Sequence, residues 1–386
     1  MQRTIKTHAQ DLDVIDWGTG AIPSMKILVT GGCGFVGAAL CRRFLQARTG
    51  LAMTVLDSLR RRGSETNVAD LEARGIRVVH GDVRVASDIE ALGPFDWVID
   101  AAAEPSVLAG TAAGGHTGRR QLVDHNLTGT VNLLEAAAGW QAGVVLLSTS
   151  RVYSIPALCG LPLVGRAGRG AARAFAVDET RPLPAGLSPS GITEAFATTA
   201  PVSLYGATKL AGETLALEYA HAAGTPLVID RCGVMAGAGQ FGRADQGIFS
   251  WWIHRWAARK PLSFIGFGGR GLQVRDCLHP DDLADLVLLQ IAAARGGEPE
   301  LIHASGGAAS ATSLAELSAW CADRLGPHDV AAGQESRPYD LPWVVLDHQT
   351  ATTRHGWKPA RAAERIFEEI ADHAERDPGW LDRCGG

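Results

Sequence analysis

The chain has 386 residues, 46% of them hydrophobic and 20% charged, and this length is enough to bury a sizeable core in one large domain or two. Its formal net charge of -5 and its dispersed Lys and Arg residues argue against nucleic-acid binding, which needs a clustered basic surface. No uninterrupted apolar run reaches the roughly 18 residues of a membrane span, so we expect a soluble protein with no membrane partner.

Residues 1–24 are expected to form a loosely held N-terminal extension. Asp11, Asp13 and Asp16 interrupt its apolar residues, so it lacks the basic start and the continuous apolar stretch of a secretion signal. The seven cysteines of the chain lie far apart, with no CxxC pair and no His spacing that suits zinc. We therefore expect reduced thiols, no metal site and a cytoplasmic location.

From Met25 to about Leu147, short β-rich apolar runs alternate with helical segments. Repetition of strand and helix predicts a parallel sheet with helices on both faces. The strands read as nearly continuous apolar runs, as expected where both faces of a sheet are covered. The runs expected as strands are KILV, AMTVLD, IRVVHGD, WVIDAA and VVLLSTS. The sequence thus predicts an α/β, Rossmann-type doubly wound parallel sheet.

We expect a dinucleotide-binding domain at 25–235 and a smaller substrate-binding lobe at 236–386, interleaved with the first. Residues 154–200 are rich in Gly, Pro, Ala and Ser and have weak periodicity, which is typical of a long loop or insertion. After them, a long helix is predicted to end at Gly224. Beyond residue 236, helical segments are separated by short strands, which fits a smaller lobe.

The segment TGGCGFVG lies between the first predicted strand and the first predicted helix. Gly31 and Gly34 would let a pyrophosphate approach the backbone amides, and Gly37 would let helix and strand pack closely. Glycines alone could form a structural turn. The argument for a dinucleotide site therefore rests on Asp57, which ends the next strand. Its carboxylate can accept hydrogen bonds from ribose hydroxyls and would repel a 2′-phosphate, which favours NAD over NADP.

Two features near this site keep alternatives open. The run Arg60–Arg62 either accommodates a 2′-phosphate or forms a solvated loop, and Asp82 either binds the adenine or caps a helix. The residues expected to contact the cofactor are Gly31, Gly34, Phe35, Val36, Gly37, Asp57, Asp82, Val83, Ala102, Asn126, Tyr205 and Lys209.

Tyr205 and Lys209 form a YxxxK motif on one face of a predicted helix, and Thr149 ends a predicted strand upstream. A free phenol has a pKa near 10, which an ammonium and a positive nicotinamide ring would lower toward the range of a general base. Thr149 could donate to the sugar oxygen that loses its proton. YxxxK alone could be an exposed helix surface, but chance rarely supplies this whole order of motifs. We expect Thr149, Tyr205 and Lys209 to be catalytic.

These motifs resemble the extended short-chain dehydrogenase/reductase family of NAD-dependent NDP-sugar epimerases and dehydratases, over roughly Met25 to Glu375. The family's NLxGTxNLLEAA begins at Asn126, and its RDxxHxxD begins at Arg275. The resemblance implies a nucleotide-sugar substrate, Arg275 as a diphosphate ligand, and a homodimer built partly on the YxxxK helix, where the apolar positions are Leu210, Leu215, Leu217 and Tyr219. The chain departs from the family at Asp100, Ala101, Ser154, Leu204 and Gly239.

Within the family, the segments SLRRRGSETN, MAGAGQFGRADQGIFSWW and GGRGLQVRDCLHPDDL resemble the CDP-paratose 2-epimerases. This likeness implies inversion at C2 of the sugar. It also places Asp245 and Gln246 at the nucleotide. The residues expected to bind substrate are Ser150, Arg151, Gln240, Gln246 and Arg275.

The residues after Thr149 narrow the reaction. In the resembling 4,6-dehydratases an Asp and a Glu stand there as acid and base, whereas this chain has Ser150 and Arg151. A permanent cation cannot exchange protons near neutral pH, so elimination and decarboxylation are disfavoured. We therefore expect epimerisation at C2, with 4-epimerisation, dehydration or dehydrogenation as alternatives. A non-catalytic NAD sensor would be expected to lose the glycine, tyrosine or lysine pattern.

Two further groups have competing interpretations. Trp251, Trp252 and Trp256 fall at helical spacing and either stack on a base or fill core, of which core is favoured. His279 lies in the RDxxH run and is expected to form structural hydrogen bonds.

Overall fold

The computed structural model describes residues 25–111, 117–170, 173–243, 246–294 and 298–385. The extension at 1–24 therefore lies outside the described residues. A seven-stranded sheet of order β15-β10-β5-β4-β1-β2-β3 forms the centre of the molecule, and each of its pairings is parallel. Its strands are β1 (Met25–Thr30), β2 (Leu51–Asp57), β3 (Arg77–His80), β4 (Trp97–Asp100), β5 (Gly143–Thr149), β10 (Leu227–Cys232) and β15 (Glu300–Ala304). This arrangement confirms the predicted doubly wound fold.

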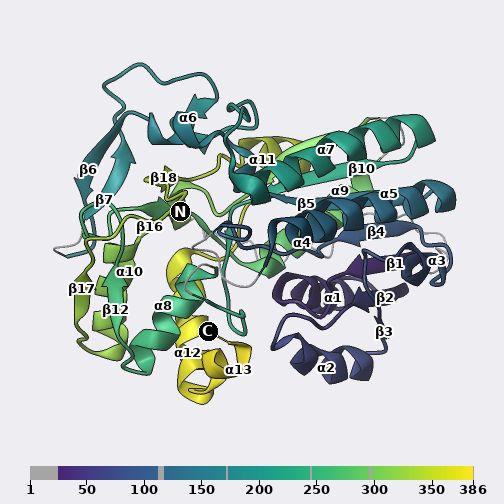
Figure 1. Cartoon of the computed structure of the whole chain (residues 1–386), viewed down its shortest axis with the longest axis horizontal. Helices are drawn as coiled ribbons and strands as arrows, with labels where there is room; N and C mark the ends of the chain where they lie inside the picture. The colour runs from purple at the N-terminus through teal and green to yellow at the C-terminus, as the bar shows by residue number, and fades with distance from the viewer. Residues whose placement is uncertain (1–24, 112–116, 171–172, 244–245, 295–297, 386) are drawn as a thin grey trace, which may run out of the picture.

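Helices cover both faces of the sheet (Figure 1). Helices α1 (Phe35–Ala47) and α9 (Pro280–Ala293) pack together on one face, and α5 (Gly129–Trp140) and α7 (Ser203–Ala223) pack together on the other. Alternate side chains of one strand supply the two cores: Ile27 and Val29 enter the first, and Leu28 enters the second. Strand order reverses between β1 and β4, and this is where a doubly wound sheet opens a ligand crevice at its carboxyl edge.

Shorter elements complete this half of the chain. They are α2 (Val68–Ala73), α3 (Ala86–Glu90), α4 (Arg119–Val123) and a π-helical turn, η3 (Asp124–Thr128). Helix α7 ends as predicted at Gly224, whose φ of +67° gives the left-handed cap that glycine adopts without strain. Among the described residues, no helix combines the length and apolar character needed to cross a membrane.

The described residues of the segment 154–200 form an insertion of short elements around one hydrophobic cluster. It contains α6 (Ile155–Cys159), the hairpin of β6 (Leu163–Ala167) and β7 (Arg173–Val177), and the short hairpin of β8 (Leu187–Ser188) and β9 (Gly191–Ile192). Its buried apolar side chains pack against Trp343 and Val345. Arg166 pairs with Glu316 at 2.8 Å, so the first hairpin is fixed to the C-terminal lobe, beside which it lies in Figure 1.

The C-terminal lobe is built on helices around small sheets. Its helices are α8 (Ile248–Ala257), α10 (Leu314–Leu325), α12 (Ala363–Arg376) and α13 (Trp380–Cys384), and its strands are β11 (Val234–Met235), β12 (Leu262–Phe264), β13 (Val274–Arg275), β14 (Cys277–Leu278), β16 (Thr312–Ser313), β17 (Val330–Ala332) and β18 (Trp343–Val344). Helix α11 (Gln349–His355) instead packs against β15 and α9 of the sheet domain. Trp252 and Trp256 are buried in its core, which confirms the core interpretation for these two. Trp251 is half-buried, and the Arg255 guanidinium lies over its ring.

The apolar positions of the YxxxK helix have different environments. Leu210 is partly buried against the core of the insertion. Leu215 and Tyr219 are partly buried against the sheet, and Leu217 remains exposed. The expected role of these positions in a dimer stays a prediction.

Candidate active site

The glycine turn after β1 is tightly packed against the chain that follows β4. Gly31 has a φ of +63°, and a Cβ there would lie 2.8 Å from the Cα of Ala102. At Gly37 a Cβ would lie 2.4 Å from the carbonyl oxygen of Gly31. The two glycines therefore allow the turn, the helix and the neighbouring strand to meet at the crevice.

Gly34 is the residue before α1, in extended conformation, and no side chain caps this helix. The first turn contains no acidic residue, so the amides at its start, including those of Phe35 and Val36, and the positive end of the helix dipole are available to an anion. This is the environment in which a pyrophosphate binds.

Asp57 ends β2 beside the glycine turn. Its two carboxylate oxygens accept hydrogen bonds from the backbone amides of Cys33 at 2.9 Å and Leu59 at 2.8 Å. Burial raises the pKa of this carboxyl, while these amides act to lower it. Each oxygen keeps a lone pair for a further donor such as a ribose hydroxyl. In the adjacent basic run, Arg61 donates to the carbonyl of Phe241, which directs its side chain to the C-terminal lobe.

Asp82 is held by a neighbouring residue. Its carboxylate accepts the Arg84 Nε at 2.9 Å, and this pairing lowers the pKa of Asp82 to about 2. The nearby helix α3 begins after Val85 without a side-chain cap, so the structure does not use Asp82 as a helix cap. Val83 is buried, and its carbonyl accepts from Asn132. Contact of Asp82 and Val83 with the adenine stays a prediction.

Asn126 fixes the loop after β4. From the π-helical turn, its Oδ1 accepts from the backbone amide of Glu104 at 2.7 Å, and its Nδ2 donates to the Glu104 carbonyl at 3.0 Å. Asp100, a departure from the family, is buried and accepts from the hydroxyls of Thr30 and Thr130. The loop that carries Ala102 is thus tied to both β1 and the start of α5.

Thr149, Tyr205 and Lys209 are brought together where β5 ends against the first turns of α7. Tyr205 and Lys209 are 8% and 4% exposed, and the Tyr205 phenol makes a hydrogen-bonding contact with Thr149. Burial raises the pKa of Tyr205 to about 12, against the lowering by Thr149 and by Arg151. Within the described part of the chain, the Lys209 ammonium makes no hydrogen bond and no ion pair. It is therefore available to a ligand.

Three arginines gather next to this group. The Nη1 of Arg151 donates to the Tyr339 carbonyl at 3.1 Å, and Arg275 lies 3.6 Å from Asp340. Burial and the positive charges of Arg275 and Arg337 lower the pKa of Arg151 to about 9. The carboxylates of Asp340 and Asp276 act on these guanidinium groups, and two carboxylates among three arginines still leave excess positive charge, as expected of a site built for an anion.

Sequence reasoning missed Arg337 and Asp340. The available signal was the run SRPYDLP, which places an arginine near an aspartate in a loop, but its partners Arg275 and Arg151 are more than 60 and more than 180 residues away in the chain. Only the pairing of β13 with β18 brings this loop to Arg275.

The other residues expected to bind substrate make contacts within the chain. The Nε2 of Gln240 donates to the Met235 carbonyl at 2.8 Å, and its buried Oε1 has no partner among the described residues. Gln246 forms backbone hydrogen bonds with Arg243, and Asp245 lies outside the described residues. Ser150 is buried in the turn after Thr149. Their contacts with substrate stay predictions.

His279 acts structurally, as expected. Its Nδ1 accepts from the backbone amide of Asp281 at the start of α9, and its Nε2 lies 3.2 Å from Glu369 of α12. The residue therefore joins a helix of the sheet to a helix of the C-terminal lobe.

Residues 27–304 match the NAD dependent epimerase/dehydratase family. The chain belongs to this family. CDP-paratose 2-epimerase of Salmonella typhi is 28% identical over 359 residues, which are 90% of this chain and 98% of that protein. dTDP-L-rhamnose 4-epimerase of Burkholderia thailandensis is 28% identical over 372 residues, or 92% of this chain and 96% of that protein.

Solved structures of epimerases show the same fold. UDP-glucuronic acid 4-epimerase from Bacillus cereus, in complex with UDP-glucuronic acid and NAD, aligns with a TM-score of 0.71 and 24% identity over 91% of this chain and 99% of that one. UDP-glucose 4-epimerase from Thermus thermophilus, in complex with NAD, aligns with a TM-score of 0.67 and 24% identity over 91% and 99%.

The cofactor of this epimerase/dehydratase family member is NAD, and the residues of the crevice fit it. The positive φ of Gly31, the uncapped start of α1 and the spare lone pairs of Asp57 supply a pyrophosphate site beside a ribose site. The Tyr205 phenol and the unpaired Lys209 ammonium lie near the end of β5, at the same carboxyl edge of the sheet.

Proposed function

We propose that the chain catalyses NAD-dependent epimerisation of a nucleotide-diphosphate sugar at C2, through a transient keto sugar. The observation that carries the proposal is the group formed by Thr149, Tyr205 and Lys209, followed by Ser150 and Arg151 where elimination would need a carboxylate pair. The likeness to CDP-paratose 2-epimerase supports the choice of C2.

In this mechanism Tyr205 removes the proton from the hydroxyl on the reacting carbon. Thr149 would orient the same oxygen: its Oγ1 accepts from the Arg151 amide at 3.2 Å, and the hydrogen that it gives to the Tyr205 phenol in the free chain would pass to the sugar oxygen once substrate binds. When bound, NAD would supply the hydride chemistry that lets the configuration at this carbon be inverted. Lys209 would hold the nicotinamide ribose and add positive charge beside the phenol.

The phenol of Tyr205 needs additional positive charge nearby before it can act as a base. With its pKa raised to about 12 by burial, the phenol of the chain alone stays protonated near neutral pH. Lys209 already belongs to the chain, so the further positive charge needed to lower this pKa would come from the oxidised nicotinamide ring. Proton abstraction would then depend on the oxidised state of the cofactor.

Substrate binding would use the arginine group. Arg151, Arg275 and Arg337 offer planar donors that match the oxygens of a diphosphate, and Asp340 orients Arg275. A diphosphate would also relieve the repulsion that lowers the pKa of Arg151.

Epimerisation at C4 is the second candidate. It is favoured by the likeness to dTDP-L-rhamnose 4-epimerase and by the two 4-epimerase structures. Both reactions need the same proton and hydride transfers, so they differ only in which carbon the pocket presents.

The test is to incubate the purified protein with CDP-, UDP- and dTDP-hexoses in deuterated buffer and to analyse the sugars by NMR. Inversion at C2 without deuterium at that carbon supports the proposal, because the hydride returns within one active site. Inversion at C4 selects the second candidate. Loss of water, or stoichiometric reduction of added NAD with no new sugar, would show that epimerisation is wrong.

We further propose a homodimer that uses α5 and α7. The two helices lie side by side, and Leu217 of α7, at 37% exposed, is one of three large apolar residues that the described part of the chain exposes. Light scattering should report twice the mass of 40.6 kDa. Leu217→Glu should shift the protein toward the monomer, and an unchanged mass would place the contact elsewhere.

A further inference from the structure

The turn that carries Thr149 is held at both ends by one buried ion pair. Glu213 and Arg231 lie 2.7 Å apart, with side chains only 3% and 7% exposed. Ser148, just before the turn, donates its hydroxyl hydrogen to Glu213. Tyr153, just after the turn, accepts from the Arg231 Nη1 at 3.2 Å. The residues between these two anchors include Thr149, Ser150 and Arg151.

The same ion pair also holds the helix of the catalytic tyrosine. Glu213 lies on α7 about two helical turns beyond Tyr205, and Lys209 lies between them on the same face. A shift of α7 against β5 would therefore have to break the hydrogen bond of Ser148 or the ion pair of Glu213. The position of Tyr205 relative to Thr149 depends on this connection.

His303 extends the network on the side of Tyr153. Its Nδ1 lies 3.0 Å from the Asp347 carbonyl, which can only accept, so Nδ1 carries the hydrogen. The other ring nitrogen, Nε2, then accepts from the Tyr153 hydroxyl. Burial lowers the pKa of His303 to about 4, which agrees with a neutral ring. Tyr153 thus donates to His303 and accepts from Arg231, and both of its hydrogen-bonding directions are fixed.

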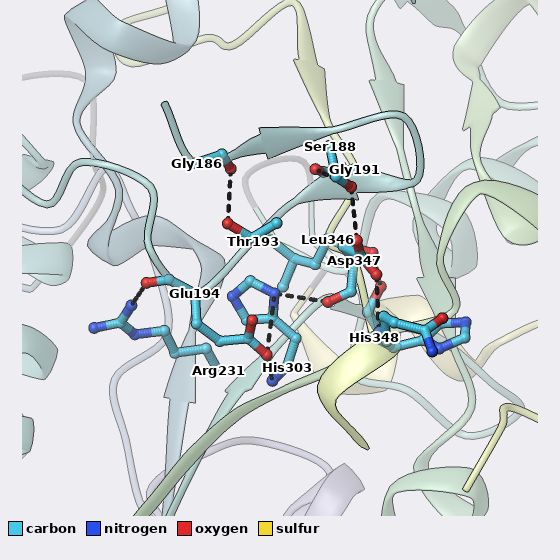
Figure 2. A network of polar contacts seen from close by, with 12 residues as sticks. Gly186, Ser188, Gly191, Thr193, Glu194, Arg231, His303, Leu346, Asp347 and His348 are labelled. Atoms are coloured by element: carbon cyan, nitrogen blue, oxygen red, sulfur yellow. Dashed lines mark hydrogen bonds and ion pairs between the residues drawn. The ribbon is translucent and has the colours of Figure 1, made fainter. Parts of the chain in front are cut away.

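The insertion closes the network. The Glu194 carboxylate accepts a hydrogen bond from the His303 backbone amide at 3.1 Å. The Glu194 carbonyl accepts one from the Arg231 Nη1 at 3.3 Å. Figure 2 shows Glu194 reaching from the segment after β9 to both residues. Ser188 of the same insertion donates to Asp347 at 2.6 Å. The insertion therefore contacts the residues beneath the catalytic turn.

We propose that Glu213, Arg231 and Tyr153 are positioning residues that set the geometry between Thr149 and Tyr205, and that the insertion, through Glu194, is part of this device. The inference rests on the proposed function, because Thr149 and Tyr205 are taken as the pair that acts on the sugar. Misplacement by about 1 Å is enough to reduce the rate of such a transfer strongly.

The first test is a double-mutant cycle with Tyr153→Phe and Thr149→Ala. Tyr153→Phe removes the hydroxyl but keeps the ring against Phe196 and His303. We expect kcat to fall about tenfold in the native background and less than twofold in the Thr149→Ala background, with KM for the sugar and Kd for NAD nearly unchanged. Equal losses in the two backgrounds, or a loss confined to KM, would overturn the proposal.

Tyr219→Phe is the matched control. It makes the same chemical change on α7, where the hydroxyl binds Glu135 outside the network, and should leave kcat within twofold. If Tyr153→Phe does not fold, Ser148→Ala removes only the other anchor and should show the same dependence on Thr149. If Ser148→Ala lowered kcat equally in the native and the Thr149→Ala backgrounds, that result would also contradict the proposal.

A second readout does not depend on turnover. The chain has 4 tyrosines, so the ionisation of Tyr205 in the NAD complex can be followed by tyrosinate absorbance, with Tyr205→Phe as the blank in each background. Tyr153→Phe should raise the pKa of Tyr205, because the contact with Thr149 that lowers it is weakened. An unchanged titration would overturn the positioning role even if no nucleotide sugar reacts, whereas absence of turnover with a shifted titration would count only against the proposed function.

Discussion

The phenol of Tyr205 and the hydroxyl of Thr149 meet between the start of α7 and the end of β5, and their contact lowers a phenol pKa that burial raises to about 12. Burial outweighs the other groups of the chain. The tyrosine is therefore ready to act as a base only when further positive charge is present.

Tyr205→Phe should lower kcat by about a hundredfold to ten-thousandfold, the range of a lost general base, and leave NAD affinity within a few fold. The ring keeps its packing while the group that accepts the proton is removed. Turnover by NMR and NAD binding by calorimetry measure the two effects. If turnover stayed within about tenfold of the wild type, another group would be the base.

Gly37→Ala should weaken NAD binding by at least about tenfold, because its Cβ would lie 2.4 Å from the Gly31 carbonyl oxygen and would move α1 from the pyrophosphate site. Gly139→Ala is the control: it lies in α5 with nothing within 4 Å of its Cβ, and should stabilise the fold by about 0.5–1 kcal/mol. Calorimetry with NAD and urea unfolding distinguish the two. Equal NAD affinity in both variants would contradict the assignment of the turn.

Asp57→Asn should reduce the preference for NAD over NADP by about tenfold or more. The substitution removes the charge that would repel a 2′-phosphate, and it places an amide donor against one of the two backbone donors, Cys33 and Leu59. Dissociation constants for the two dinucleotides give the ratio. A ratio that does not change would mean that the run Arg60–Arg62 decides the preference.

Arg151→Ala should raise KM for the nucleotide sugar by about tenfold to a hundredfold, the expected cost of one charge-assisted hydrogen bond. Arg120→Ala is the control, because its side chain is 88% exposed and, among the described residues, pairs only with Asp124 four residues along the chain. Steady-state kinetics report both variants. An unchanged KM in Arg151→Ala would place the diphosphate on Arg275 and Arg337 alone.

Asp230→Asn should stabilise the protein more at pH 8 than at pH 4. Burial raises the pKa of Asp230 to about 7 from its ordinary 3.8, so between these values the folded chain holds a proton that the unfolded chain has released. Stability from this group is therefore lost as pH rises through that window, by at most about 4 kcal/mol for three pKa units. The Asn variant does not titrate.

Urea unfolding of both proteins at the two pH values tests this difference. Other titrating groups, such as the buried His254 and His303, are common to both proteins and cancel in the comparison. A gain of the same size at pH 4 and pH 8 would mean that the carboxyl group titrates normally.

The positions of the glycine turn, of Asp57 and of Thr149 and Tyr205 at one edge of the sheet could be predicted, because each belongs to a short motif at the end of a predicted strand or on a predicted helix. Gly31 follows β1, Asp57 ends β2 and Thr149 ends β5. In a parallel sheet these ends share one edge, so local patterns together with one topological rule bring the residues together.

The arginine group could be predicted only in part. Arg151 and Arg275 were expected at the substrate, whereas Arg337 and Asp340 come from a loop whose place depends on the pairing of β13 with β18.

By itself, the sequence determined the fold class and the NAD-dependent family, since these follow from periodicity and from motifs only a few residues long. Tertiary structure alone decided which residues surround the proposed proton-transfer group. Glu213, Arg231 and His303 lie on three separate elements, and Tyr153 lies in the chain that follows β5. Their hydrogen bonds form only when burial excludes water from all four at once, and no local pattern records that event.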